Sequence, residues 1–164
     1  MFANIKYDIS SNKGNTKGQM LALSFRIAHF ISTNPSIIIR LAGIPIRLIY
    51  VVCIRWILGV DLDEKTTVGK GLIIFHGQGL VINSETIIGE RVILRQNTTI
   101  GNKEKAGKSP VIGDDVNIGA NVVIIGDVHI GEKSIIGAGS VITKNVPSRV
   151  AVAGNPFKII KNLE

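Results

Sequence analysis

The chain has 164 residues and a net charge of +7, with 45% hydrophobic residues, 18 glycines, one cysteine and 5% aromatic residues. This composition excludes a disordered chain, a disulfide-stabilised scaffold and a cysteine-rich metal site. Many glycines with few aromatic rings instead favour one domain with tight turns and an aliphatic core.

The positive charge is concentrated in the first third of the chain. Residues 1–60 hold seven basic residues and one acidic residue, which gives +6, whereas residues 61–100 sum to −1 and residues 101–164 to +2. A positive surface of this kind could meet an anionic membrane or an acidic substrate. Nucleic acid is not an expected partner, because the chain has no Lys/Arg run and no known motif that reads nucleic acid.

Residues 1–60 are expected to form an N-terminal helical segment. Residues 1–16 are polar, and we expect them to be irregular or loosely held. Apolar residues at spacings of three and four predict a helix over residues 17–33. The Asn34-Pro35 pair is expected to end this helix.

Residues 36–60 are the most apolar stretch of the sequence. Three arginines, Arg40, Arg47 and Arg55, interrupt it, and Pro45 breaks any single helix, so a membrane span is not expected. We expect two short amphipathic helices that pack on the protein itself, and the alternative is that residues 36–60 lie on a membrane surface. Because no cleavable signal is visible, the expected location is the cytoplasm, with peripheral contact at the inner face of the membrane as the alternative.

From Leu62 onward an aliphatic residue recurs every six residues, with a two-residue insertion after Leu80 and an interruption at residues 102–109. These anchors are Leu62, Val68, Ile74, Leu80, Ile82, Ile88, Leu94, Ile100, Ile112, Ile118, Ile124, Ile130, Ile136 and Ile142. Four residues after most anchors stands a small or β-branched residue: Thr66, Thr86, Val92, Thr98, Val116, Val122, Val128, Ser134, Ser140 and Val146.

This repeat predicts a mainly β fold built as a triangular coil. Each six-residue unit is a short strand and a turn, three units make one circuit of 18 residues, and the anchors stack inward at about 4.8 Å. The fourteen anchors imply between four and five coils over residues 61–147, followed by a C-terminal tail at residues 148–164. The interrupting segment 102–109 is polar and is expected to be a loop extruded from the coil. It is a candidate functional loop, and the alternative is a tolerated surface insertion.

His76 is the best candidate for a catalytic base among the three histidines. It lies in an early coil between an aromatic residue and Gly77, and Asp61 stands fifteen residues earlier, three short of one circuit. Stacked coils could bring this carboxylate to the imidazole, fix its tautomer and leave the other ring nitrogen free as a base. His29 and His129 are expected to be structural and exposed, respectively, without a catalytic role.

Metal catalysis and a covalent cysteine intermediate are not expected. A zinc site on such a coil needs three clustered histidines, and only two histidines lie on the predicted coils. Cys53, the one cysteine, stands in an apolar helical stretch and is expected to be inert.

Several motifs together resemble one known family. They are K-G with F-R-I-A-H-F (residues 17–18 and 25–30), V-D-L-D (60–63), G-L-I-I-F-H-G-Q-G-L-V-I (71–82), V-I-G-D-D-V-N-I-G-A (111–120), I-I-G-A-G-S-V-I (135–142), and N-V-P with V-A-G-N-P (145–156). The chain resembles the hexapeptide-repeat acetyltransferases, and more narrowly the serine acetyltransferase group, from about residue 17 to residue 160.

This resemblance implies a left-handed parallel β-helix that transfers acetyl from acetyl-CoA to a hydroxyl group. Asp61 and His76 match the family's catalytic pair at the same spacing, with His76 as the general base and Asp61 as its orienting carboxylate. The matching small positions for CoA binding are Gly101, Ala120 and Ala138, and the basic candidates for the CoA phosphates are Lys144, Lys158 and Lys161. The family works as a trimer with active sites in grooves between adjacent subunits.

Three departures from the serine acetyltransferase pattern bear on the acceptor. Phe75 stands where the family has an aspartate, Lys108-Ser109 stands where it has Arg-His, and only a short segment precedes residue 17. Those groups hold an amino acid's charges, so we expect poor binding of free serine. The short form more closely resembles the colanic acid and capsular polysaccharide O-acetyltransferases, which implies a sugar hydroxyl as acceptor. The alternatives are serine, a small-molecule or xenobiotic acceptor, and a β-helix scaffold without chemistry.

Overall fold

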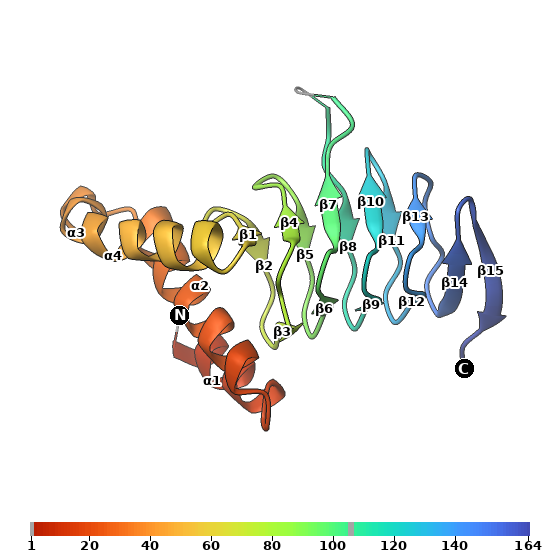
Figure 1. The fold of residues 1–164 in the computed structure, drawn as a ribbon, viewed down its shortest axis with the longest axis horizontal. Helices are drawn as coiled ribbons and strands as arrows, with labels where there is room; N and C mark the ends of the chain where they lie inside the picture. Colours follow the sequence, from red (N-terminus) through yellow and green to blue (C-terminus); the bar gives the residue numbers. More distant parts are fainter. Residues whose placement is uncertain (1, 105–106) are drawn as a thin grey trace.

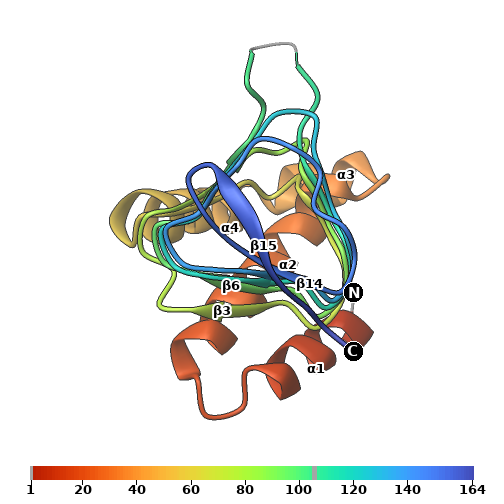
Figure 2. The same ribbon diagram turned by 90° about the vertical axis from the view of Figure 1, so that its right-hand side faces the viewer.

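The computed structural model of the protein describes residues 2–104 and 107–164. Helices lie at one end of the elongated molecule, and a β-solenoid extends from them to the C-terminus (Figure 1). Seen along the solenoid, the coils superpose on a triangular outline (Figure 2). This arrangement confirms the predicted coil, and a hexapeptide repeat of this kind implies a left-handed β-helix.

Three sheets form the three faces of the solenoid, and successive coils pair in parallel. The first face contains β1 (Val60–Leu62), β4 (Leu80–Ile82), β7 (Thr99–Gly101), β10 (Val123–Ile125) and β13 (Val141–Ile142). The second face contains β2 (Thr67–Val68), β5 (Ile87–Ile88), β8 (Val111–Ile112) and β11 (His129–Ile130). The third face contains β3 (Ile73–Phe75), β6 (Ile93–Arg95), β9 (Asn117–Ile118), β12 (Ile135–Ile136), β14 (Val150–Gly154) and β15 (Phe157–Asn162).

The interior of the solenoid is a column of aliphatic side chains. All fourteen predicted anchors are buried, and Val68, the most exposed of them, is only 7% exposed. The small and β-branched residues that follow them are buried as well, from Thr66 at the first coil to Val146 at the last. The prism is therefore filled by Ile, Leu and Val, which pack well on pleated strands.

The two-residue insertion lies at a different place from the one we expected. In the register of the third and first faces, Phe75 pairs with Arg95 and Val81 pairs with Thr99. Five residues, 76–80, therefore separate Phe75 from Val81, whereas three, 96–98, separate their partners Arg95 and Thr99 one coil later. The placement after Leu80 is wrong: the extra pair is His76-Gly77, because residues from Gln78 onward already match the next coil.

The first residues form a helix, so the expectation of an irregular start is also wrong. Helix α1 (Phe2–Ser11) packs against α2 (Thr16–Thr33) and against the first coil. Asp8 is 1% exposed and accepts hydrogen bonds from Arg26 of α2 and from the backbone N–H groups of Gly71 and Leu72. These partners lie 18 to 64 residues away, so the local sequence carries no sign of them.

Residues 37–57 form three consecutive helical pieces: α3 (Ile37–Ala42), α4 (Ile44–Ile49) and η1 (Tyr50–Ile57), a turn of π-helix that continues α4. Pro45 stands in the first turn of α4, where its missing N–H has no intrahelical partner to lose. Only Tyr50 and Ile54 of these three pieces are buried. Within the described residues, every helix is too short or too polar to cross a bilayer.

The loop and the C-terminal segment complete the solenoid. The extruded loop connects β7 to β8 and projects from one corner of the triangle (Figure 2); residues 105 and 106 of the expected loop lie outside the described residues. Residues 148–164, expected as a tail, contain a β-hairpin: β14 pairs in parallel with β12, and β15 pairs antiparallel with β14.

Candidate active site

His76 occupies a strained turn at the edge between the third and first faces, which we call the histidine edge. Its φ is +67°, and the N–H of Gly77 donates a hydrogen bond of 2.8 Å to the carbonyl of Phe75. This is a γ-turn with a side chain in the left-handed region, a conformation that residues other than glycine rarely adopt. Six other residues with side chains also have a positive φ, so the γ-turn and not the φ alone distinguishes His76. The exposed imidazole is carried on the inserted pair described above.

The turn that carries His76 is packed against the residues just before Asp61. The N–H of Gly79 donates to the carbonyl of Gly59 at 2.8 Å. A Cβ added at Gly77 would come within 3.3 Å of Val60 and within 2.9 Å of Leu21. Gly77 is therefore required both for its φ of +80° and for this close approach. The sequence positions of His76 and Asp61 are thus brought to adjacent parts of the first coil.

Asp61 points outward from the first face, and its carboxylate is bound by Arg55 of η1. The Nε of Arg55 lies 2.7 Å from Asp61 Oδ1, and the Asp61 side chain is 48% exposed. Between the described residues His76 and Asp61 the structure has no hydrogen bond. Oδ2 of Asp61 also has no hydrogen bond to a described residue, so one carboxylate oxygen is held by Arg55 and the other is free for an imidazole N–H.

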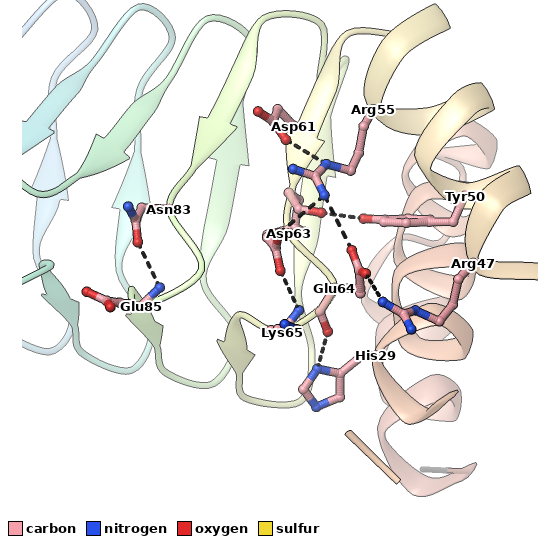
Figure 3. A network of polar contacts seen from close by, with 11 residues as sticks. His29, Arg47, Tyr50, Arg55, Asp61, Asp63, Glu64, Lys65, Asn83 and Glu85 are labelled. Atoms are coloured by element: carbon pink, nitrogen blue, oxygen red, sulfur yellow. Dashed lines mark hydrogen bonds and ion pairs between the residues drawn. The ribbon is translucent and has the colours of Figure 1, made fainter. Parts of the chain in front are cut away.

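Arg55 belongs to a network of ionic contacts that joins η1 to the first coil (Figure 3). It also contacts Asp63 at 3.2 Å and Glu64 at 3.4 Å, and Arg47 contacts Glu64 at 2.8 Å. Burial alone would raise the pKa of Glu64, but the hydrogen bond and charge of Arg47, together with Arg55, outweigh it and lower this pKa. The network keeps Glu64 ionised and fixes η1 beside Asp61.

Two further side chains fix the helices on this coil. The Tyr50 hydroxyl donates to the carbonyl of Leu62 at 2.7 Å, and burial raises the pKa of Tyr50, so it stays protonated. His29 Nδ1 lies 2.9 Å from the carbonyl of Glu64 (Figure 3). This contact agrees with the structural role expected for His29.

Phe75 stands directly before the base and is 38% exposed at the end of β3. The guanidinium of Arg95, its neighbour on β6, lies 5.6 Å from the centre of the ring. Next to His76 the surface is thus aromatic with a cation beside it, and it offers no carboxylate to an ammonium group at this position.

A shallow groove of about 330 Å³ runs over the first face beside Asp61. Its polar lining includes Arg55, Asp63, Asn83 and Asn102, and Gly101 lies at its far side. Amide and hydroxyl groups in such a groove can hydrogen-bond a neutral, hydroxyl-rich molecule. The groove therefore connects Asp61 to the base of the extruded loop.

The loop residues expected to contact the substrate lie at the edge between the first and second faces, which we call the loop edge. Ser109 is 8% exposed, and its hydroxyl lies 3.3 Å from the Oδ1 of Asn83. Lys108 is exposed and pairs with Asp127 at 3.2 Å. Both residues are thus on a different edge of the triangle from His76.

The expected CoA-binding residues divide between the same two edges. Ala120 and Ala138 stand one above the other on the histidine edge, where the N–H of Gly139 donates to the carbonyl of Ala120 at 2.9 Å. Gly101 ends β7 at the loop edge, and Lys144 follows β13 there and is exposed. Lys158 and Lys161 are exposed on β15 of the third face. A single prism does not bring these groups into one site.

Arg55 is the site residue that the sequence reasoning missed. In the sequence it stands only as one of three arginines that interrupt an apolar stretch. A signal was present, because Arg55 stands six residues before Asp61 and eight before Asp63, but only the turn from η1 into β1 places the guanidinium against these carboxylates.

Comparisons with known proteins agree with this fold. Residues 109–144 match the family model described as bacterial transferase hexapeptide (six repeats). Serine acetyltransferases 4 and 2 of Arabidopsis thaliana are 35% and 33% identical to the chain over 88% and 90% of its length. The chain spans only 39% and 44% of those two proteins. An acetyltransferase proposed to act in colanic acid biosynthesis in Escherichia coli strain K12 is 30% identical over 51% of this chain and 52% of its own length.

Solved structures show the same similarity. Soybean serine acetyltransferase in complex with serine superposes with a TM-score of 0.81 at 29% identity, covering 96% of this chain and 68% of that one. Serine acetyltransferase of Brucella abortus strain S19 superposes with a TM-score of 0.83 at 25% identity, covering 98% and 69%. The chain belongs to the hexapeptide-repeat acetyltransferase family, in the group that contains the serine acetyltransferases.

Proposed function

We propose that the protein is an O-acetyltransferase that moves acetyl from acetyl-CoA to a hydroxyl group, with His76 as the general base. The observation that carries this proposal is the γ-turn that presents His76 in a left-handed conformation next to the strand of Asp61. Family membership supports the reaction class, and a solved serine acetyltransferase of the same fold is described as a complex with CoA.

In the proposed reaction His76 removes the proton of the acceptor hydroxyl as its oxygen attacks the thioester carbonyl. The C–S bond then breaks, acetyl is left as an ester on the acceptor, and the imidazolium returns its proton to the CoA sulfur. Asp61 orients the imidazole and stabilises its charged form through the free Oδ2. Backbone N–H groups of the coil are the proposed donors to the thioester oxygen.

A homotrimer would complete the site. His76, Ala120 and Ala138 line the histidine edge, whereas Gly101, Lys108, Ser109 and Lys144 line the loop edge. When prisms pack side by side, the histidine edge of one subunit can face the loop edge of the next. This division supports active sites between subunits, with Lys144 and Lys158 as candidates for the CoA phosphates. Because acetyl-CoA is a cytoplasmic metabolite, we place the reaction in the cytoplasm.

For the acceptor we propose a sugar hydroxyl of a surface polysaccharide or its precursor. The support comes from Phe75 beside the base, which offers an aromatic surface on which a sugar ring can stack. The groove beyond Asp61 is lined by the charged Arg55 and Asp63 and by Asn83 and Asn102, whose amide groups hydrogen-bond each other at 3.1 Å. Lys108 and Ser109, at the positions expected to contact the substrate, are committed to Asp127 and Asn83. The similarity to the proposed colanic acid acetyltransferase, which covers 51% of this chain, also supports a sugar acceptor.

L-Serine is the second candidate, and the comparisons taken alone favour it. The relatives that match along 88% and 90% of this chain are serine acetyltransferases. The neighbour from soybean is described as a complex with serine. Against it stands the uncharged Phe75, because a buried or pocketed ammonium needs an anionic or hydrogen-bonding partner.

Release of CoA from acetyl-CoA tests the catalytic assignment. We expect Asp61→Asn, which keeps the shape of the side chain and removes its charge, to lower kcat at least ~10²-fold. Asp63→Asn is the matched control. Asp63 also contacts Arg55, but it is not the carboxylate that we assign to His76. Equal effects of the two substitutions would show that the network, and not the proposed dyad, accounts for the loss.

A further inference from the structure

The helices α3, α4 and η1 carry an apolar surface without a partner in the described chain. Eleven large apolar side chains are more than a third exposed here: Ile37, Ile38, Ile39, Leu41, Ile44, Ile46, Leu48, Ile49, Val52, Trp56 and Ile57. Trp56 is 77% exposed and Ile38 is 75% exposed. The other eleven exposed large apolar residues are spread over the whole of the rest of the described chain. A contiguous surface of this kind marks a docking site.

The charged side chains of these three helices are all arginines. Residues 36–60 hold three arginines and no aspartate or glutamate. Arg40 is exposed on α3 and makes no ion pair within the described residues. Arg47 and Arg55 are partly exposed while they pair with carboxylates of the first coil. Apolar side chains bordered by arginine, with a tryptophan among them, are the composition of helices that lie in a membrane interface.

The position of these helices leaves them accessible to a flat surface. They extend beyond the end of the solenoid, away from the extruded loop and from the C-terminal hairpin (Figure 1). Tyr50 and Ile54 anchor η1 to the protein, whereas the eleven apolar side chains given above stay more than a third exposed. A contact of this surface with its own copy would offer Arg40 no carboxylate from residues 36–60 as a partner.

We propose that α3, α4 and η1 form a membrane-docking surface that lies on an anionic lipid bilayer. The apolar side chains would enter the acyl boundary, and Arg40, which makes no ion pair within the described residues, would lie at the level of the phosphates. The lipid surface is favoured over a protein partner because Arg40, the exposed charge that no described carboxylate pairs, suits an anionic headgroup and because the apolar side chains cover three successive helices that include Trp56. This inference does not depend on the reaction proposed above.

Trp56 provides a direct probe, because it is the only tryptophan of the chain. The full chain is mixed with vesicles of phosphatidylcholine alone or with added phosphatidylglycerol. We expect flotation with the anionic vesicles, a shift of the Trp56 emission to shorter wavelength, and weaker binding at high salt. Absence of both flotation and the emission shift with anionic vesicles would overturn the proposal.

Variants separate the lipid from a subunit interface. The double substitution Ile38→Ser with Leu48→Ser should weaken vesicle binding at least about tenfold, and Arg40→Glu should weaken it several-fold. Ile135→Ser with Ile160→Ser is the matched control, since both residues are exposed on the solenoid, and it should leave binding unchanged. If the helix variant lowers the molar mass measured by light scattering while wild-type protein ignores vesicles, the surface is an interface between copies.

Discussion

Arg55 Nε lies 2.7 Å from Oδ1 of Asp61, so the carboxylate proposed to orient the base is itself held by a residue of the helical segment. The contact uses one carboxylate oxygen and leaves the other toward the solvent. Arg55 is thus a positioning residue for Asp61, and the N-terminal helices take part in the site through it. The solenoid alone would leave Asp61 free to rotate.

Substitution of Arg55 tests this relationship. Arg55→Gln should lower kcat by about 10- to 100-fold with little change in the KM for acetyl-CoA, because the misplaced carboxylate no longer holds the imidazole. Arg55→Lys, which keeps the charge but not the planar geometry, should recover part of the loss. Steady-state kinetics measure both. An Arg55→Gln enzyme with wild-type kcat would show that Asp61 needs no such support.

Phe75 is predicted to control the choice of acceptor. Phe75→Asp places a carboxylate beside His76 and should raise kcat/KM for L-serine relative to a sugar acceptor by about tenfold or more. Phe75→Leu, which removes the ring without adding a charge, should weaken sugar use and leave L-serine as poor as before. Competition between the two acceptors measures the ratio. An unchanged ratio in Phe75→Asp would mean that this position does not contact the acceptor.

The buried pair of Asp8 and Arg26 should be important for stability. The Asp8 carboxylate is 1% exposed and accepts from Arg26 Nε at 2.7 Å and from Gly71 N–H at 2.7 Å. Asp8→Asn leaves the guanidinium buried without its counter-charge and should lower the free energy of unfolding by about 3–5 kcal/mol.

Urea denaturation checks this value against an exposed ion pair. Asp115 is held by Arg91 at 2.6 Å on the surface of the solenoid. Asp115→Asn should lower the free energy of unfolding by no more than about 1 kcal/mol. Similar losses for the Asp8 and Asp115 variants would contradict the view that α1 is fastened through a buried charge.

The contacts of Glu64 predict a pH dependence of stability. Its pKa is lower in the folded protein than in the unfolded chain, so the ion pairs with Arg47 and Arg55 stabilise the fold above the unfolded value and are lost as pH falls through the folded value. The difference in the free energy of unfolding between wild type and Glu64→Gln should therefore shrink on acidification below about pH 4.3.

The solenoid could be predicted from the sequence because its determinants are local and repeated. Thirteen of the fourteen anchors from Leu62 to Ile142 report the same inward position, and Leu80, which pairs with Val60 instead, is buried as well. Helix α1 could not be predicted, since Asp8 finds its partners in α2 and in the first coil. The fold that creates those partners is not visible in residues 1–16.

The candidate site was predicted in part. The spacing of Asp61 and His76 indicates that both residues lie in one coil. The position of the two-residue insertion depends on strand register, and the sequence does not show on which side of Leu80 the two extra residues lie. Only the pairing of Phe75 with Arg95 and of Val81 with Thr99 assigns the additional pair to His76-Gly77. The division of the site between two edges likewise follows from the closed triangle and not from any local pattern.

The most direct measurement is the release of CoA from acetyl-CoA by the full chain with L-serine, with a panel of sugars and without acceptor. The account predicts release that depends on the acceptor, an O-acetyl ester as product, a higher kcat/KM for a sugar than for L-serine, and a loss of at least ~10²-fold in His76→Asn. Unchanged release by His76→Asn would contradict the assignment of the base, and a preference for L-serine would contradict the proposed acceptor.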